Sequence, residues 1–216
     1  LRQREGWYPA LRGRVAVEGD VRDVGERFGC AVSAAFEFEE FGEKFGKTHE
    51  CIHFENYQFL NQAGEIEVIF DFSISDNPEN YSNYESGVDI PIFLNTVKMT
   101  LAELAIYYQF NEEMHYGFNG LPTFVNRDII EVSTLSENPT TNIFEQLATD
   151  FQFVDDRVGM VTPRIICMII NEAFYTVQEG TASKEDIDLG MKLGTNYPMG
   201  PFEWSEKLGV ANVYEL

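Results

Sequence analysis

The sequence predicts an α/β protein in which a largely parallel sheet is followed by an all-helical C-terminal region. Two observations predict this class. Short apolar runs alternate with helical stretches through most of residues 1–154, which is the pattern of strand–helix repeats. From Thr162 onward the pattern changes to helices alone. We therefore expect two domains, residues 1–154 and residues 155–216.

The strands of the first domain are expected in regular succession. Alternating valines in residues 14–20 end at a Gly–Asp turn signal and predict the opening strand. A helix is expected to end at residues 28–29, and residues 76–86 predict a connection or a short helix. Residues 37–47 show no periodicity that assigns them. The remaining strands are expected at residues 30–36, 50–54, 67–72, 89–94, 115–118 and 129–132.

Two helices are expected within the first domain. Thr100 starts the earlier one, because its hydroxyl can accept from free backbone amides and Glu103 completes a capping box. This helix is expected to run through Tyr108. Residues 140–150 predict the second helix.

Three helices are expected in the second domain, each with a local start or stop signal. Thr162 caps the first, with Pro163 at its first position, where the missing N–H costs nothing. Gly180 suits the left-handed cap that ends it. Ser183 starts the next helix and Pro201 opens the last. The helices are expected at residues 162–178, 183–193 and 201–208.

Composition indicates a globular protein and limits its partners. Of the 216 residues, 44% are hydrophobic, enough for a sizeable core. The formal net charge of −21 argues against nucleic-acid binding, which needs phosphate-neutralising Lys and Arg. No apolar run reaches the roughly 20 residues of a membrane span, and no secretory signal is visible. We expect a cytoplasmic protein with neither a nucleic-acid nor a membrane partner.

The cysteines predict no metal site. Cys30, Cys51 and Cys167 are odd in number and have no paired spacing. Cys51 lies two residues from His53, but no further cluster of ligands joins them. We expect structural thiols in a reducing compartment.

A series of short motifs identifies a family. In chain order they are Asn95–Thr96, Ile129–Val132, Asn171–Ala173, Asp186–Asp188, Met191–Gly194 and Pro198–Glu203. In this order and roughly this spacing, residues 88–210 resemble 3-hydroxyacyl-CoA dehydrogenases. The resemblance implies a reduced Rossmann-like nucleotide-binding domain and a helical substrate and dimerisation domain. It also implies NAD as cofactor, an acyl-CoA-like ligand in the cleft, a homodimer formed through the helices, and a place in fatty acid metabolism.

The resemblance also assigns the catalytic positions. Counting back from Ile129 places Asn119 at the family's catalytic histidine and Glu131 at the glutamate that orients it. Oxidising an alcohol needs a base, and an imidazole with a pKa near 6.5 suits that role. An asparagine amide does not exchange a proton at neutral pH. His115, on the same predicted strand, is the alternative base; otherwise it is a packed or solvated histidine.

Other family positions have changed as well. Asn95 is kept, but the substrate-binding serine and asparagine of the family fall on Val97 and Pro163. A dinucleotide fingerprint needs G-x-G-x-x-G after the first strand. Gly19 is the candidate for that loop, although neighbouring aspartates repel a pyrophosphate. Asp71 is the candidate for the nicotinamide ribose.

Three functional hypotheses follow from these residues. The first is a relative of the family that is weak or inactive in NAD-dependent oxidation of 3-hydroxyacyl-CoA to 3-oxoacyl-CoA, because Asn119 replaces the base. The alternative is an active dehydrogenase with an altered site. The third is an oligomerisation module whose nucleotide half serves only as a scaffold.

Overall fold

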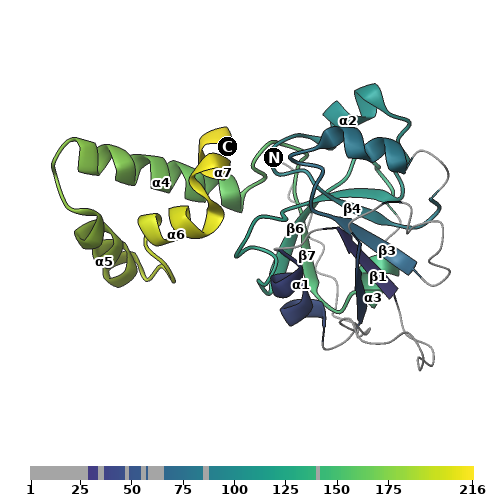
Figure 1. Ribbon diagram of the computed structural model, residues 1–216, viewed down its shortest axis with the longest axis horizontal. Coiled ribbons are helices and arrows are strands. Elements are labelled where there is room, and N and C mark those ends of the chain that lie inside the picture. Colours follow the sequence, from purple (N-terminus) through teal and green to yellow (C-terminus); the bar gives the residue numbers. More distant parts are fainter. Residues whose placement is uncertain are drawn as a thin grey trace.

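The chain folds into a seven-stranded sheet domain followed by a helical unit (Figure 1). The computed structural model describes residues 29–33, 37–46, 49–54, 57, 66–84, 88–139 and 142–216. The strand order is β2-β1-β3-β4-β5-β6-β7. The strands are β1 (Gly29–Ser33), β2 (Glu50–His53), β3 (Ile66–Asp71), β4 (Ile92–Asn95), β5 (His115–Phe118), β6 (Ile129–Ser133) and β7 (Asp150–Phe153).

Strand direction confirms the predicted largely parallel sheet. Among the described strands, β5 and β6 pair antiparallel, with Phe118 opposite Val132. The other neighbouring pairs are parallel. Because β6 runs against β5, the segment after β5 and the start of β6 lie at the same edge of the sheet.

Both faces of the sheet are buried, which explains why its strands are apolar at successive positions. In β3, Phe70 faces one core cluster and Ile69 the other. Helices α1 (Glu37–Phe45) and α3 (Asn142–Gln146) cover the Phe70 face, and Phe70 stacks on Phe93 with ring centroids 4.7 Å apart. Helix α2 (Leu101–Tyr107) and the 3-10 helix η2 (Pro78–Asn83) cover the opposite face.

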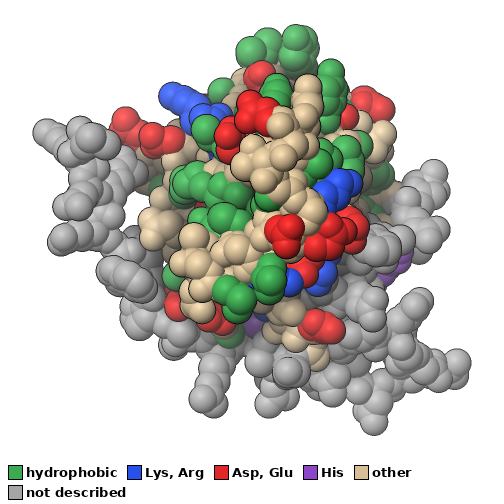
Figure 2. Space-filling view, turned by 90° about the vertical axis from the view of Figure 1, so that its left-hand side faces the viewer, with side chains coloured by type: hydrophobic (Ala, Val, Ile, Leu, Met, Phe, Trp, Pro, Cys, Tyr) green, Lys and Arg blue, Asp and Glu red, His purple; other side chains and the backbone are tan. Residues whose placement is uncertain are grey.

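The helical unit follows β7. It consists of α4 (Thr162–Gln178), α5 (Lys184–Thr195), α6 (Pro201–Leu208) and α7 (Val210–Glu215). Figure 2 views the molecule from this end and shows hydrophobic side chains at the surface, with acidic ones among them. Within the part of the chain that the structure describes, none of the helices has the length and apolarity needed to cross a membrane.

A third core cluster joins the two parts of the molecule. Val97, Leu121 and Phe124 of the sheet domain pack with apolar residues of the helical unit, namely Ile166, Cys167, Ile170, Trp204, Leu208 and Val213. Lys98 adds an ion pair of 2.6 Å to Glu215 in α7 and another of 2.5 Å to Asp76. The helical unit is therefore anchored to the sheet domain through the residues that follow β4 and β5.

The local signals for helix starts and stops are largely confirmed. The Thr100–Glu103 capping box is present at the start of α2, and Ser183 accepts the backbone N–H of Asp186 at 3.1 Å. Gly180 has φ of 75°, the left-handed conformation expected after α4. These signals act within a few residues, so the surrounding fold does not have to supply them.

Three assignments in the first domain differ from the structure. Gly29 begins the interior strand β1 instead of ending a helix, because all five residues of this strand are buried between β2 and β3. Residues 37–47, left unassigned, contain α1. The helix predicted at residues 140–150 ends at Gln146, and Asp150 starts β7, where Phe151 and Phe153 pack against the core. The predicted opening strand, residues 14–20, lies outside the described residues, as does Gly19.

Candidate functional site

The candidate site lies where β5 ends, β6 begins and α4 starts. Asn119 directly follows β5 and donates its backbone N–H to the carbonyl oxygen of Glu131 on β6, at 3.4 Å. Both residues line one pocket of about 570 Å³. Its other lining residues are Phe124, Asn126, Arg127, Asp128, Ile129, Gln152 and Thr162. The structure therefore brings together the two positions that the resemblance assigns to catalysis.

Asn119 organises the loop that follows β5. Its side chain is nearly buried, at 3% exposure, and its Oδ1 accepts the backbone N–H of Leu121 at 3.2 Å. Asparagine commonly stabilises turns in this way. The amide has no proton to exchange at neutral pH, so it positions backbone and offers hydrogen bonds, but it is not a general base.

The Glu131 carboxylate is engaged by the start of α4. It accepts the backbone N–H groups of Val161 at 3.0 Å and Thr162 at 2.9 Å, together with the Thr162 hydroxyl. The first amides of a helix lack intrahelical partners and favour a nearby negative charge. Glu131 thus caps α4 from a different element.

This contact corrects the predicted start of α4. Val161 is the N-cap residue and Thr162 is already helical, one position earlier than expected. The Thr162 hydroxyl donates to Glu131 instead of accepting a backbone amide. Pro163 is buried in the first turn, where its missing N–H is tolerated.

His115 does not belong to this site. It starts β5, whereas Asn119 follows the end of the strand, so the two are roughly 13 Å apart along an extended chain. Its Nδ1 accepts the backbone N–H of Asn111 at 3.0 Å, and its ring packs on Tyr81 and Phe110. Burial lowers the pKa of His115 to about 4, so the ring is neutral at pH 7. The alternative base proposed from the sequence is wrong in this structure.

Asn95 holds the ends of three strands together. Its Nδ2 donates to the carbonyl of Phe72, just after β3, and its Oδ1 accepts the backbone N–H of Gly120, after β5. Nearby, Gly117 lies so close to Thr96 and Ser133 that a Cβ would collide with both hydroxyls. Asn95 is nearly buried and serves the local backbone at this edge of the sheet.

Val97 and Pro163 are apolar and enclosed. Val97 is fully buried in the third core cluster, where it packs with Leu121 and Ile166. The backbone carbonyl of Val97 accepts the N–H of Gly159 at 2.6 Å. In this chain Val97 therefore serves packing between the sheet domain and α4, and Pro163 is buried in the first turn of α4.

A second pocket continues from the first. It measures about 380 Å³ and shares Arg127 and Thr162 with the pocket around Asn119. Its other lining residues are Ile165, Ile166, Tyr197, Pro198 and Trp204. We call the two pockets together the interdomain groove, because it runs from the edge of the sheet to the apolar surface of α4 and α6.

Cationic groups lie beside the groove in an otherwise acidic protein. The Arg127 guanidinium stacks over the Phe124 ring at 4.4 Å. Burial lowers the pKa of Arg127, and the charge of Glu131 opposes that effect. Lys44 of α1 donates to the Arg127 carbonyl; burial lowers its pKa to about 8, against the raising effect of Asp128 and Asp150. Arg127 is the lining residue best suited to an anionic group.

The sequence after β1 and the placement of Asp71 do not fit a dinucleotide in the ordinary mode. Residues 34–36, which connect β1 to α1, have the sequence Ala-Ala-Phe and contain no glycine. In a dinucleotide-binding domain the backbone after the first strand approaches the pyrophosphate closely, which is why glycines are needed there. Asp71, the predicted ribose contact, is fully buried and hydrogen-bonded within the protein.

The buried thiols of Cys30 and Cys51 lie outside the interdomain groove. Cys30 and Cys51 are register partners on β1 and β2, and burial raises the pKa of Cys30. Among the described residues, no three side chains of His, Cys, Asp or Glu gather in a way that would hold a metal ion.

A mostly parallel sheet that shares a core cluster with a following helical unit defines the class as a Rossmann-like domain joined to a helical domain. Comparisons identify the family. Residues 159–216 match the family model described as 3-hydroxyacyl-CoA dehydrogenase, C-terminal domain. The C-terminal residues therefore belong to the 3-hydroxyacyl-CoA dehydrogenase family, and the rest of the chain is similar to members of that family over part of their length.

Relatives support this assignment over different lengths. The chain is 46% identical over 63 residues to 3-hydroxyadipyl-CoA dehydrogenase of Escherichia coli, covering 29% of this chain and 13% of the relative. It is 32% identical over 122 residues to a probable 3-hydroxybutyryl-CoA dehydrogenase of Bacillus subtilis, covering 54% and 42%. The chain thus spans less than half the length of these relatives.

A solved structure extends the likeness to the sheet domain. The crystal structure of (S)-3-hydroxybutyryl-CoA dehydrogenase from Ralstonia eutropha superposes with a TM-score of 0.63 at 18% identity, covering 86% of this chain and 84% of that chain. At this identity the likeness establishes the fold, and it confirms the predicted fold class.

The sequence missed several residues of the site. Arg127 carried no signal of its own, since it lies in a predicted loop between two strands. The capping role of Glu131 depends on a contact across 31 positions. The partners of Asp71 range from Ser33 to Tyr84, so no local motif announces them.

Proposed function

We propose that this chain is a 3-hydroxyacyl-CoA dehydrogenase-like protein that is weak or inactive in the family reaction and binds an acyl-CoA-like ligand in the interdomain groove. The family reaction is NAD-dependent oxidation of a 3-hydroxyacyl-CoA to a 3-oxoacyl-CoA. The observation that carries the proposal is the Asn119–Glu131 pair. The residue at the position of the base cannot exchange a proton, and the carboxylate that would orient a base caps α4 instead.

The chemistry sets the size of the expected defect. When hydride leaves a secondary alcohol, the hydroxyl proton must be taken by a group held within hydrogen-bond distance. Loss of a positioned base lowers the rate by about 10²–10⁴. Asn119 still offers hydrogen bonds at that position, so binding of a substrate-like thioester is compatible with the loss of turnover.

The groove supports a ligand with an apolar part and an anionic part. Ile165, Ile166 and Trp204 provide an apolar wall, and Arg127 stands where the two pockets meet. A net charge of −21 repels anions at long range, so an acyl-CoA depends on local cations such as Arg127. Asp128 and Glu131 also line the groove, but the Glu131 charge is directed at the amides of α4.

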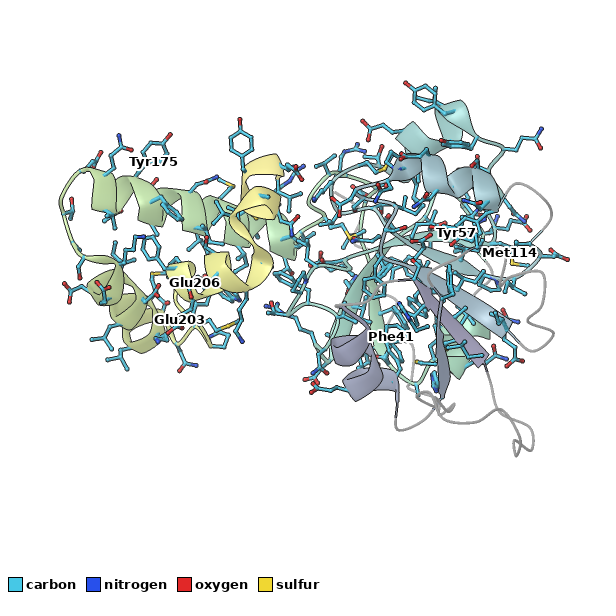
Figure 3. All side chains as sticks on the ribbon, viewed as in Figure 1. Phe41, Tyr57, Met114, Tyr175, Glu203 and Glu206 are labelled. Carbon is cyan, nitrogen blue, oxygen red and sulfur yellow. The ribbon has the colours of Figure 1, made fainter. Side chains whose placement is uncertain are left out.

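The surface of the helical unit supports a homodimer. On α4, Met168 and Tyr175 are 67% and 60% exposed, and Figure 3 shows Tyr175 on the outer side of the helix. Further exposed apolar residues of the unit are Ile165, Leu189, Leu193, Val210 and Tyr214. Exposed apolar surface of this kind is typical of an interface, and a second copy of the chain is the partner we propose.

The test combines turnover with binding. The purified chain is assayed at 340 nm with 3-hydroxybutyryl-CoA and NAD, beside an active dehydrogenase of the family, and is titrated with acetoacetyl-CoA in a calorimeter. We expect a rate at least about 100-fold below that of the active enzyme, together with measurable acetoacetyl-CoA binding. A rate within tenfold of the active enzyme would favour an active dehydrogenase with an altered site. Failure to bind the thioester would favour an oligomerisation module.

A further inference from the structure

The sheet has one point where a nucleotide crevice is expected. From β1 the chain passes to β2 on one side, and it later returns to β3 on the other side. Open α/β sheets bind ligands outside the carboxyl ends of the strands at such a reversal of strand order. Here the two carboxyl ends are Ser33 of β1 and Asp71 of β3, which are register partners.

At this point the protein buries a carboxylate and surrounds it with donors. Asp71 is fully buried. Its Oδ2 accepts the hydroxyls of Tyr57 at 2.7 Å and Tyr84 at 2.6 Å. Its Oδ1 accepts the backbone N–H of Ser73 at 2.8 Å, the Ser73 hydroxyl at 2.7 Å and the Ser33 hydroxyl. We call these five residues the Asp71 cluster.

Five donors use the full accepting capacity of the carboxylate. A carboxylate offers about four lone-pair sites on its two oxygens. Hydrogen bonds to an ionised acceptor are stronger than neutral ones, and they offset the cost of burying the charge. A ribose hydroxyl would have to displace one of the donors that already hold Asp71.

Aromatic packing closes the cluster from one side of the sheet. The Tyr57 and Tyr84 rings meet edge to face at 5.4 Å, and Tyr57 also contacts Phe54 at 5.5 Å. Tyr84 is nearly buried. In Figure 3, Tyr57 lies on the α2 side of the sheet, opposite Phe41 of α1. Burial and the charge of Asp71 raise the pKa of both tyrosines, so they remain donors.

The chain next to the cluster also lacks what a dinucleotide needs. The Ala-Ala-Phe connection after β1 has no glycine. A dinucleotide-binding domain needs glycines after its first strand, because the backbone there approaches the pyrophosphate closely.

From this geometry we infer that the crevice at the reversal of strand order is closed by the Asp71 cluster, so that NAD and NADP do not bind there. This inference rests on the proposed function and deepens it, because it removes the hydride acceptor as well as the base. Ligand binding is then confined to the interdomain groove, which lies beside the end of β5 and the start of β6.

The experiment pairs cofactor binding with stability. The whole chain is titrated with NADH and with NADPH in a calorimeter. Its melting temperature is also measured with and without about 1 mM of each nucleotide, because a ligand in excess raises the melting temperature of a protein that binds it even weakly. We expect no heat of binding and no shift in melting temperature. Binding with a dissociation constant below about 100 µM, a range that linkage at 1 mM detects readily, would overturn the inference.

The Asp71→Asn variant distinguishes two roles of Asp71: a structural carboxylate in a closed crevice, or a residue that binds the ribose of NADH. If the crevice is closed, the NH₂ group of the new asparagine points at hydroxyl and N–H donors and cannot accept their hydrogen bonds. We then expect the melting temperature to fall on the order of 5 °C. In a ribose site, stability would be unchanged and NADH affinity would fall, which would contradict the inference. Asp89→Asn, an exposed carboxylate in the same domain, is the matched control.

Two further measurements keep the outcome decisive. If Asp71→Asn fails to fold, Tyr84→Phe removes one donor and is expected to lower the melting temperature by a smaller amount. An unchanged melting temperature in that variant would count against the cluster. Acetoacetyl-CoA is titrated into the same preparations: its failure to bind would reject the proposed ligand while leaving the inference about NADH standing.

Discussion

The carboxylate of Glu131 on β6 receives the backbone N–H of Thr162 at 2.9 Å, so a strand of the sheet domain caps the first helix of the helical unit. Asp156 makes a similar contact, accepting the N–H groups of Leu101 and Ala102 at 3.0 Å at the start of α2. Asp188 of α5 does the same for Phe202 at the start of α6. Acidic side chains distant in sequence thus accept backbone N–H groups at the starts of three helices, in addition to the local caps of α2 and α6.

Replacement of Glu131 is expected to affect stability first. Glu131→Ala removes the acceptor for the first amides of α4, and we expect the free energy of unfolding to fall by about 1–2 kcal/mol. Glu131→Gln keeps one acceptor oxygen and should lose less. Urea denaturation measures both, with Glu137→Ala, an exposed glutamate, as control. Unchanged stability in Glu131→Ala would show that the carboxylate is not needed as a cap.

Restoring an imidazole at position 119 is expected not to restore the family reaction. In Asn119→His the base returns, but the closed crevice still excludes the nicotinamide. We expect no measurable NADH production from 3-hydroxybutyryl-CoA at 340 nm, with circular dichroism confirming that the variant is folded. A gain of about 100-fold or more over the parent, the scale of a restored base, would mean that the cofactor site is intact and that only the base is missing.

Arg127 is expected to control binding of the anionic ligand. Arg127→Ala removes the cation at the junction of the two pockets, and we expect acetoacetyl-CoA affinity to fall about tenfold, equivalent to about 1.4 kcal/mol. Calorimetric titration gives the dissociation constants. Arg157→Ala is the control, since this exposed arginine changes the net charge equally without lining the groove. Equal effects of the two variants would point to long-range charge alone.

Acid is expected to weaken the fold through His115. The folded pKa of about 4 lies below the usual value of 6.5, because burial disfavours the charged ring. The unfolded chain therefore binds more protons between these values, so stability is retained above pH 6.5 and lost as pH falls toward 4. The loss amounts to about 3 kcal/mol.

His115→Asn isolates that contribution from the carboxylates, which also titrate in acid. Urea denaturation of parent and variant is compared at several pH values between 4 and 7. We expect the difference in unfolding free energy between them to narrow as pH falls. A difference that stays constant over this range would contradict a buried neutral His115.

The homodimer is expected to depend on the apolar surface of α4. Met168→Glu places a charge in the proposed interface, and we expect light scattering after size-exclusion chromatography to show a monomer in place of a dimer. Ile106→Glu is the control, because Ile106 is 74% exposed but lies on α2 in the sheet domain. A parent chain that is monomeric at tens of micromolar, a typical working concentration for such measurements, would reject the interface.

Much of the helical unit was predictable from the sequence because its signals are local. Ser183 and Gly180 act on backbone groups a few residues away, and Pro201 opens α6 as expected. The strands at residues 115–118 and 129–132 were also predicted within a residue. In contrast, β7 was hidden, because its alternating Phe151 and Phe153 follow directly on a short helix.

The sequence by itself determined the fold class, the helix signals and the position of Asn119 after a strand, since each depends on residues close together in the chain. Only the tertiary structure decided what the carboxylates do. Glu131 meets α4, and Asp71 meets donors from Ser33 to Tyr84, because the path of the backbone brings distant segments together. A buried charge must be satisfied by whichever donors the fold places around it, and sequence spacing does not specify those donors.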